Sequence, residues 1–204
     1  MSRTKESIRI VAILGSIRPD NMTSKALGLV ADEIRKHPDI QLEVIDPKNL
    51  NLSLPGEADE RSAQMLQKIV AKATGVILAT PEYHGSYSSV IKLVIDNLGF
   101  PSVLAGKPVA LLGVAAGQIG AIKAIEHLRS VCSHIGAIVL PGVVSIAGVH
   151  KYFDTQGRCL DENVEKRVRA LGISLIDYIR NHICPRMILE EMVRGDTERY
   201  SIKR

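Results

Sequence analysis

Three short segments carry the residue types that bind phosphate groups and flat aromatic rings. The first, residues 15–24, places several hydroxyls, an amide and Arg18 between an apolar run and a helical pattern. Hydroxyls and backbone N–H groups at the start of a helix bind anions, and an arginine adds charge-assisted hydrogen bonds. A helix cap alone would need only one of Asn21, Thr23 and Ser24. Because the segment matches neither the G-x-G-x-x-G fingerprint nor a P-loop, we expect it to bind a phosphate monoester.

The second segment, residues 80–88, combines turn-forming residues with two tyrosines in a chain that is only 3% aromatic. Tyr83 and Tyr87 can stack on a planar ring or shield it from water. Pro81 is expected to end the preceding strand, and Gly85 permits a close approach of the backbone to a ligand. A simple turn would not explain the tyrosines, so this segment is a second candidate ligand loop.

The third segment, residues 113–121, holds three glycines and three alanines. Small residues let a backbone approach the edge of a ring or a pyrophosphate, and Gln118 can hydrogen-bond a ring carbonyl or a ribose. Tight packing of a helix on a strand explains the same composition nearly as well. Its interpretation as a ligand loop therefore depends on its place beside the other two segments.

An alternation of strand and helix patterns positions these segments. Short apolar runs predict strands at 8–14, 41–45, 75–80, 108–114 and 137–140, of which those at 8–14 and 75–80 are typical of buried strands. Apolar residues at helical spacing predict helices at 21–36, 59–72, 89–98, 119–135 and 162–181. Crossover helices between strands make the sheet parallel, with helices on both of its faces. Ligands bind beyond the carboxyl ends of such strands, and the three segments fall there.

Length, composition and charge exclude several classes of protein. The 204 residues, 46% of them hydrophobic, suit one domain with a full core. We assign residues 1–184 to this domain and 185–204 to a C-terminal tail that packs on a neighbour or frays. The net charge of +4 is mild and forms no Lys/Arg block, which argues against nucleic-acid binding. No apolar run reaches the ~18–20 residues of a membrane span, and the N-terminus lacks a secretory pattern, so we expect a cytoplasmic protein.

The cysteines and histidines predict neither a disulfide framework nor a metal site. Cys132, Cys159 and Cys184 are odd in number, widely spaced and without a C-x-x-C pair. The six histidines form no H-E-x-x-H pattern. His84 is a candidate proton donor, although a surface or hydrogen-bonded histidine is the favoured interpretation.

Together the three segments resemble the NADPH-dependent FMN reductase family of flavodoxin-like proteins, which includes quinone, azo-dye and chromate reductases. The matching residues are Gly15-Ser16-x-Arg18 with the hydroxyls that follow, Pro81-Glu82-Tyr83-His84-Gly85-Ser86, Gly117-x-x-Gly120, and Lys92-x-x-x-Asp96-Asn97. The resemblance extends from about Ile8 to the last helix. It implies a flavodoxin-like, doubly wound sandwich whose five-stranded parallel sheet has the order 2-1-3-4-5.

The resemblance also implies where FMN lies. It places the FMN phosphate on Ser16, Arg18, Met22, Thr23 and Ser24. It places the ribityl chain and ring, largely through backbone contacts, along Pro81, Glu82, Tyr83, His84, Gly85 and Ser86, with Ala116 and Gly117 near the ring.

The sequence departs from the family pattern in three places. Asn21 stands where the family usually has a serine, which leaves the assignment among residues 21–24 open. Ser88 and Ser89 replace a common Pro-Gly pair. Asn97 replaces a frequent tryptophan, and this change is expected to make one wall of the site more polar.

The function implied by the resemblance is an NAD(P)H-dependent oxidoreductase. Hydride passes from NADPH, or NADH, through FMN to a small acceptor, which is free flavin, a quinone, an azo compound or a metal ion. FMN is either held throughout or released as a product. Arg18 or Lys123 is expected to favour NADPH through its extra phosphate, and the resemblance implies a homodimer or homotetramer. A flavodoxin-like electron carrier and a non-catalytic flavin-binding module remain alternatives, although the basic net charge disfavours a carrier.

Overall fold

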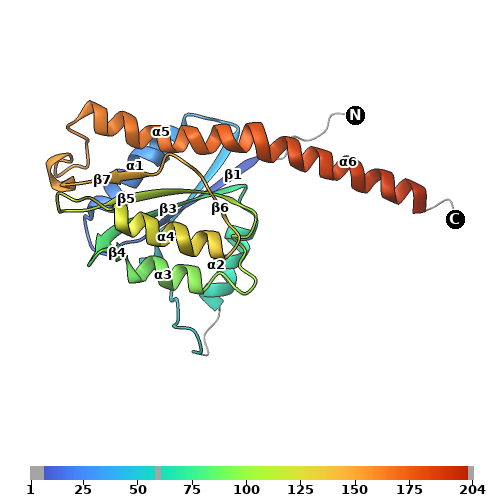
Figure 1. Ribbon diagram of the computed structural model, residues 1–204, viewed down its shortest axis with the longest axis horizontal. Coiled ribbons are helices and arrows are strands. Elements are labelled where there is room, and N and C mark those ends of the chain that lie inside the picture. Colours follow the sequence, from blue (N-terminus) through green and yellow to red (C-terminus); the bar gives the residue numbers. More distant parts are fainter. Residues whose placement is uncertain (1–6, 58–60, 202–204) are drawn as a thin grey trace.

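A parallel sheet forms the centre of the molecule (Figure 1), for which the computed structural model describes residues 7–57 and 61–201. Its main strands are β1 (Ile8–Leu14), β2 (Ile40–Ile45), β3 (Gly75–Tyr83), β5 (Pro108–Val114) and β6 (Ile138–Val139), in the order β2-β1-β3-β5-β6. The predicted order 2-1-3-4-5 is thus confirmed. The sheet counts seven strands because β4 (Ser86–Tyr87) pairs with β3, and β7 (Val144–Ile146) joins β6 beside β5.

Helices cover both faces of this sheet (Figure 1). One face carries α1 (Met22–Arg35) and α5 (Glu162–Tyr178), and the other carries α2 (Arg61–Ala71), α3 (Ser89–Asp96) and α4 (Ile122–His134). Short helical turns are η1 (Pro47–Asn49), η2 (Val149–Lys151) and the π turn η3 (Ile179–Ile183). The last helix, α6 (Cys184–Ser201), continues α5 through η3 and extends beyond the sheet. None of the helices in the described ranges is long and apolar enough to cross a bilayer.

The central strands β1, β3 and β5 are buried on both faces, as expected of a parallel sheet covered by helices, whereas the edge strand β2 is largely exposed. In β1, Ile10 and Ala12 pack under α1 and α5, while Val11 and Ile13 pack under α2, α3 and α4. All four side chains are at most 3% exposed. This explains why the run has no polar alternation and why it could be recognised as a buried strand.

The expectation that Pro81 ends the third strand is wrong. Pro81 pairs with Val114 in the parallel ladder, and β3 continues to Tyr83. A proline keeps a backbone geometry that a strand tolerates and lacks only its N–H donor, so it can occupy the last rungs of a ladder. The second segment consequently leaves the sheet three residues later than predicted.

Two predicted helices also have different limits. The helix expected over 119–135 begins only at Ile122, because Gly120 has a φ of +77° that a right-handed helix does not adopt. The helix expected over 162–181 passes at Ile179 into the π turn and then into α6. Apolar spacing alone gives no sign of a π turn. The first residues of the helix expected over 59–72 lie outside the described residues.

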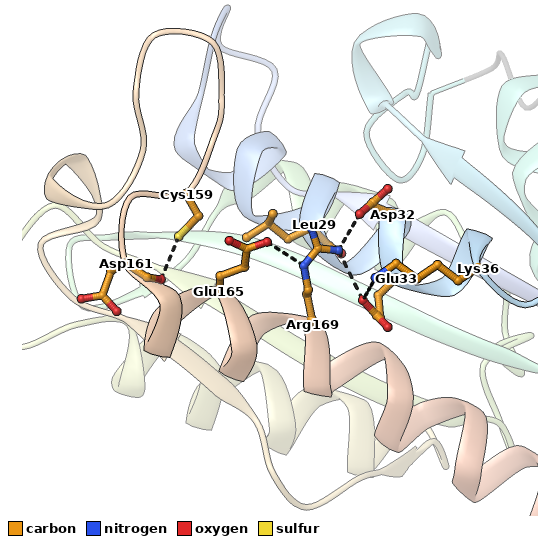
Figure 2. Close-up of polar contacts among 8 residues, drawn as sticks. All are labelled: Leu29, Asp32, Glu33, Lys36, Cys159, Asp161, Glu165 and Arg169. Atoms are coloured by element: carbon orange, nitrogen blue, oxygen red, sulfur yellow. Dashed lines mark hydrogen bonds and ion pairs between the residues drawn. The ribbon is translucent and has the colours of Figure 1, made fainter.

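Arg169 fastens α5 to α1 through a group of ion pairs (Figure 2). Its Nη1 donates to Asp32 Oδ2 at 2.5 Å and to Glu33 Oε2 at 3.3 Å, and its Nε donates to Glu165 Oε1 at 2.8 Å. The hydrogen bond from Arg169 is the main cause that lowers the pKa of Asp32. The pKa of Glu33 is lowered mainly by Lys36, with Arg169 contributing. Both carboxylates therefore stabilise the folded chain while they are ionised.

Replacing Arg169 with leucine is expected to lower the free energy of unfolding at neutral pH by about 1 kcal/mol, since the pairs are partly exposed and screened. A carboxylate with a lowered folded pKa loses its stabilising effect as the pH falls through that value. The difference between wild type and R169L should therefore shrink on acidification to about pH 3. Urea unfolding across this range measures it, with R129L on α4 as the control, because Arg129 forms no ion pair within the described residues. A difference that stays constant with pH would contradict the ion-pair account.

Two glycine-to-alanine substitutions are expected to act in opposite directions. A Cβ at Gly113 would lie 2.7 Å from the Cβ of Ala121 and 2.9 Å from Ile125, so G113A should destabilise the fold by about 1–3 kcal/mol. A Cβ at Gly28 in α1 would meet nothing within 4 Å. Because alanine is the better helix former, G28A should stabilise by about 0.5–1 kcal/mol. Urea unfolding of both variants checks the signs; a neutral G113A would show that β5 and α4 can separate at little cost.

Candidate functional site

Buried hydrogen bonds hold the first two ligand loops together at the carboxyl edge of the sheet. The Gly15 N–H donates to the carbonyl of Ala79 at 2.7 Å. The Ser88 hydroxyl donates to the Gly15 carbonyl at 2.6 Å, and the Ser88 N–H donates to Thr80 Oγ1 at 3.0 Å. Thr80 and Ser88 are both at most 1% exposed. The loop after β1 is therefore fixed against the end of β3 and the start of α3.

The loop after β1 ends in a helix cap made by Asn21. Its Oδ1 accepts from the Ser24 N–H at 2.8 Å, and the Ser24 hydroxyl donates to the Asn21 carbonyl at 2.7 Å. The cap thus comes from the residue that replaces the family's serine, while Ser24 is engaged in holding it. The N–H groups of Met22 and Thr23 lie in the first turn of α1, where a helix has no internal acceptors for them.

Ser16 is the residue in this loop whose buried side chain lacks a hydrogen-bond partner. It is 3% exposed, and its Oγ is the one buried side-chain nitrogen or oxygen atom in the described part of the chain that lacks a hydrogen-bond partner. A buried hydroxyl without a partner costs free energy that an accepting ligand would recover. Thr23, predicted for the same role, is also buried. A phosphate at the start of α1 fits this pair of hydroxyls.

The loop after β3 is a tight hairpin. Tyr83 pairs with Ser86 in the antiparallel ladder, and the two residues between them, His84 and Gly85, have φ values of +50° and +78°. Two central residues with positive φ are typical of a type I′ turn, whose twist matches that of the strands. Glu82 Oε1 accepts a short hydrogen bond from the Gly85 N–H and braces the turn. The predicted residues here are thus held in a rigid backbone, which suits contacts made through main-chain atoms.

The structure separates the roles of the two tyrosines and of Arg18. Tyr87 is half-buried against the core, whereas Tyr83 is 36% exposed. The guanidinium of Arg18 lies over the Tyr83 ring, 5.1 Å from its centroid, as a cation–π contact. Of the two, Tyr83 is the ring that remains able to border a ligand, and Arg18 joins the first loop to the hairpin.

The loop after β5 is exposed at Ala116 and Gly117 but anchored beneath them. The Gly117 carbonyl accepts from the Gly148 N–H at 3.0 Å, and the Ala121 N–H donates to Ser145 Oγ at 2.9 Å. A Cβ at Gly117 would meet nothing within 4 Å. The space above this loop is therefore open, as a ring edge would require.

Some residues that build the site had no role in the sequence prediction. Ser88 could have been found, because a serine that precedes an apolar helix is a capping signal. Ser145 and His127 had no local signal, since their contacts with Ala121 and Ser86 join distant parts of the chain. The expectation that Asn97 makes one wall of the site more polar is wrong within this chain. Asn97 lies at the C-terminal end of α3, away from the hairpin, and donates to the carbonyls of Ser53 and Leu93.

The fold of the chain is flavodoxin-like. An archaeal flavodoxin shares the fold with a TM-score of 0.58 at 12% identity, covering 85% of this chain and 99% of that one. The flavoenzyme NAD(P)H:(acceptor) oxidoreductase FerB from Paracoccus denitrificans shares it with a TM-score of 0.69 at 24% identity, covering 86% and 98%.

Residues 8–151 match the family model for NADPH-dependent FMN reductase, and the chain belongs to that family. An NAD(P)H-dependent FMN reductase from Pseudomonas aeruginosa is 29% identical over 182 residues, covering 82% of this chain and 95% of the relative. A 2-hydroxy-1,4-benzoquinone reductase from Burkholderia sp is 26% identical, covering 86% and 98%. An NADPH azoreductase from Bacillus sp. is 31% identical, covering 70% and 79%. The protein is an FMN-dependent NAD(P)H oxidoreductase.

The two buried serines at the first loop are expected to respond differently to loss of the hydroxyl. S88A removes a hydroxyl that bonds Gly15 and caps α3, so it should cost about 1–2 kcal/mol of stability. S16A removes an unpartnered hydroxyl, so the flavin-free protein should be unchanged or stabilised by about 1 kcal/mol. Urea unfolding of the flavin-free variants tests this, and equal losses in both would show that Ser16 has a structural partner.

Proposed function

We propose that this chain holds FMN across the three loops, receives hydride from NADPH or NADH, and passes it to a flat, conjugated organic acceptor of the quinone or azo class. The observation that carries the proposal is the buried, unpartnered hydroxyl of Ser16 at the start of α1. Buried hydroxyls are normally hydrogen-bonded within the protein, and the oxygens of a phosphate would give the Ser16 hydroxyl the partner that it lacks.

Each loop has a role in this proposal. The phosphate is bound by the hydroxyls of Ser16 and Thr23, the first-turn N–H groups of Met22 and Thr23, and the guanidinium of Arg18. Ser24, predicted for the same role, instead holds the Asn21 cap with both of its donors. Pro81, Glu82, Tyr83, His84, Gly85 and Ser86 border the ribityl chain and ring. Ala116 and Gly117 approach the ring edge through an exposed backbone. To reach the phosphate, Arg18 exchanges its contact with Tyr83 for a charge-assisted hydrogen bond, which is the stronger interaction.

FMN supplies the hydride chemistry when bound, so no protein nucleophile is required. The chain's own contribution is to orient the reactants and to keep the ring edge within reach of fixed donors. The rigid hairpin and the anchored loop at Gly117 provide this positioning.

The acceptor class is supported by apolar side chains around the site. Exposed apolar residues lie on or beside the three loops: Ile17, Tyr83, Ile119 and Ile122. Such a border favours a planar organic molecule over a hydrated metal ion. The printed names of the relatives, which include a benzoquinone reductase and azoreductases, agree with this choice.

We further propose that the protein works as a cytoplasmic homodimer or homotetramer in which the tail takes part in the contacts. Closed homo-oligomers are the common form of soluble assemblies. Exposed apolar side chains lie along α6: Met187, Ile188, Leu189, Met192 and Val193. The three cysteines are free thiols, which suits a reducing compartment. Light scattering of the full chain and of a chain ending at Ile183 would test the role of the tail. An equal number of subunits in the two assemblies would show that the tail is not needed for the interface.

Purified protein is expected to be yellow with flavin absorbance, to be bleached anaerobically by NADPH, and to recover its colour when a soluble quinone is added. S16A should weaken FMN binding about tenfold, because it removes a hydrogen bond to a charged group. Flavin fluorescence during titration measures this, with the exposed-site variant S133A as the control. Bound FMN that neither nucleotide bleaches would leave the carrier or the binding module. NADPH oxidation only with added, unbound FMN would indicate that FMN is a substrate.

A further inference from the structure

Helix α4 places two basic side chains along the outer edge of the hairpin. The ring of His127 lies 3.1 Å from the Ser86 hydroxyl through Nδ1. One turn earlier, the Cδ of Lys123 lies 4.0 Å from the position of a Cβ on Gly85. Both side chains are exposed. The hairpin proposed to border the flavin ring therefore has a cationic rim on the side of α4.

The charge of Lys123 has no partner within the described ranges of the chain. Other lysines near functional loops are already engaged: Lys25 donates to the Asp154 carbonyl, and Lys92 pairs with Asp96. Glu126, the carboxylate one turn away on α4, forms no ion pair with Lys123 in the described structure. An unpaired ammonium beside a ligand site is a ready partner for an anion.

The site must deal with more than one anionic group. Arg18 belongs to the same loop as Ser16 and, under the proposed function, serves the FMN phosphate. NADPH differs from NADH only by a phosphate on the adenosine ribose, so discrimination requires a group that gains from that extra charge. On the α4 side of the hairpin, Lys123 is such a group.

We infer that Lys123 binds the 2′-phosphate of NADPH and makes the enzyme prefer NADPH to NADH, with His127 as a second donor held in place by Ser86. This rests on the proposed function, because it assumes that the nicotinamide meets the flavin at the hairpin. Lysine acts here as a point charge on a flexible stem, so arginine should replace it and glutamine should not.

The test uses the FMN-loaded protein and two probes that cannot transfer hydride. Binding of 2′,5′-ADP and of 5′-AMP, which differ only in the 2′-phosphate, is measured by calorimetry for wild type, K123Q, K123R and K72Q. Lys72 is an exposed lysine at the opposite edge of the sheet, so K72Q removes the same charge elsewhere. Wild type, K123R and K72Q should bind 2′,5′-ADP about tenfold more tightly than 5′-AMP, and K123Q should bind the two alike. The ratio of kcat/KM for NADPH to that for NADH should fall by the same factor in K123Q, mainly through KM for NADPH.

Three results would overturn the inference. The first is a wild type that binds both probes equally. The second is a K123Q variant that keeps the preference. The third is a K123Q variant that loses affinity for both probes alike, which would place Lys123 on the shared 5′-phosphate. Failure of the proposed function looks different, because a flavin that NADPH never bleaches would be seen in wild type regardless of how the probes bind.

Discussion

The close approach of Gly15 to the neighbouring strand is the constraint on which the site depends. A Cβ at Gly15 would lie 2.5 Å from the carbonyl oxygen of Ala79 and 2.4 Å from Ile91 Cγ1, so no other residue fits without displacement. This contact lets the Gly15 N–H reach Ala79 and its carbonyl accept from Ser88. The start of the loop that carries Ser16 is thus held in a fixed position against β3 and α3. The position of the proposed phosphate loop is a consequence of how tightly β1 and β3 pack.

The same edge of the sheet shows a contrast between polar groups that are satisfied within the fold and the Ser16 hydroxyl, which is not. Ser88 and Thr80 satisfy each other and the backbone, and they bury polar atoms without loss. Ser16, one residue after Gly15, is buried to the same degree and has no partner. Sites of function are often less stable locally than the scaffold around them, because their groups are arranged for a molecule that is not part of the chain.

Much of the fold could be predicted because parallel strands buried on both faces leave unbroken apolar runs such as Ile8–Leu14. The three candidate ligand loops could be predicted because they lie at the carboxyl ends of strands. What could not be predicted arose from contacts between distant residues. The extension of β3 through Pro81 depends on β5, and the use of Asn21 rather than Ser24 as the cap depends on backbone geometry. The hairpin needs positive φ values at both His84 and Gly85. The glycine indicated one of them, whereas the histidine gave no sign of the other.

The π turn η3 sets the direction in which the end of the chain points. An α-helix rotates by about 100° per residue, and a π turn accommodates one extra residue, so all that follows is turned by about that angle relative to an uninterrupted helix. Ile179 still packs in the core under α5, whereas Leu189 and Val193 face water on α6. Inserting or deleting a residue in the five-residue segment η3 would therefore rotate α6 about its own axis without changing the domain that precedes it. The direction in which the exposed apolar side chains of α6 point is thus set independently of the chemistry of the site.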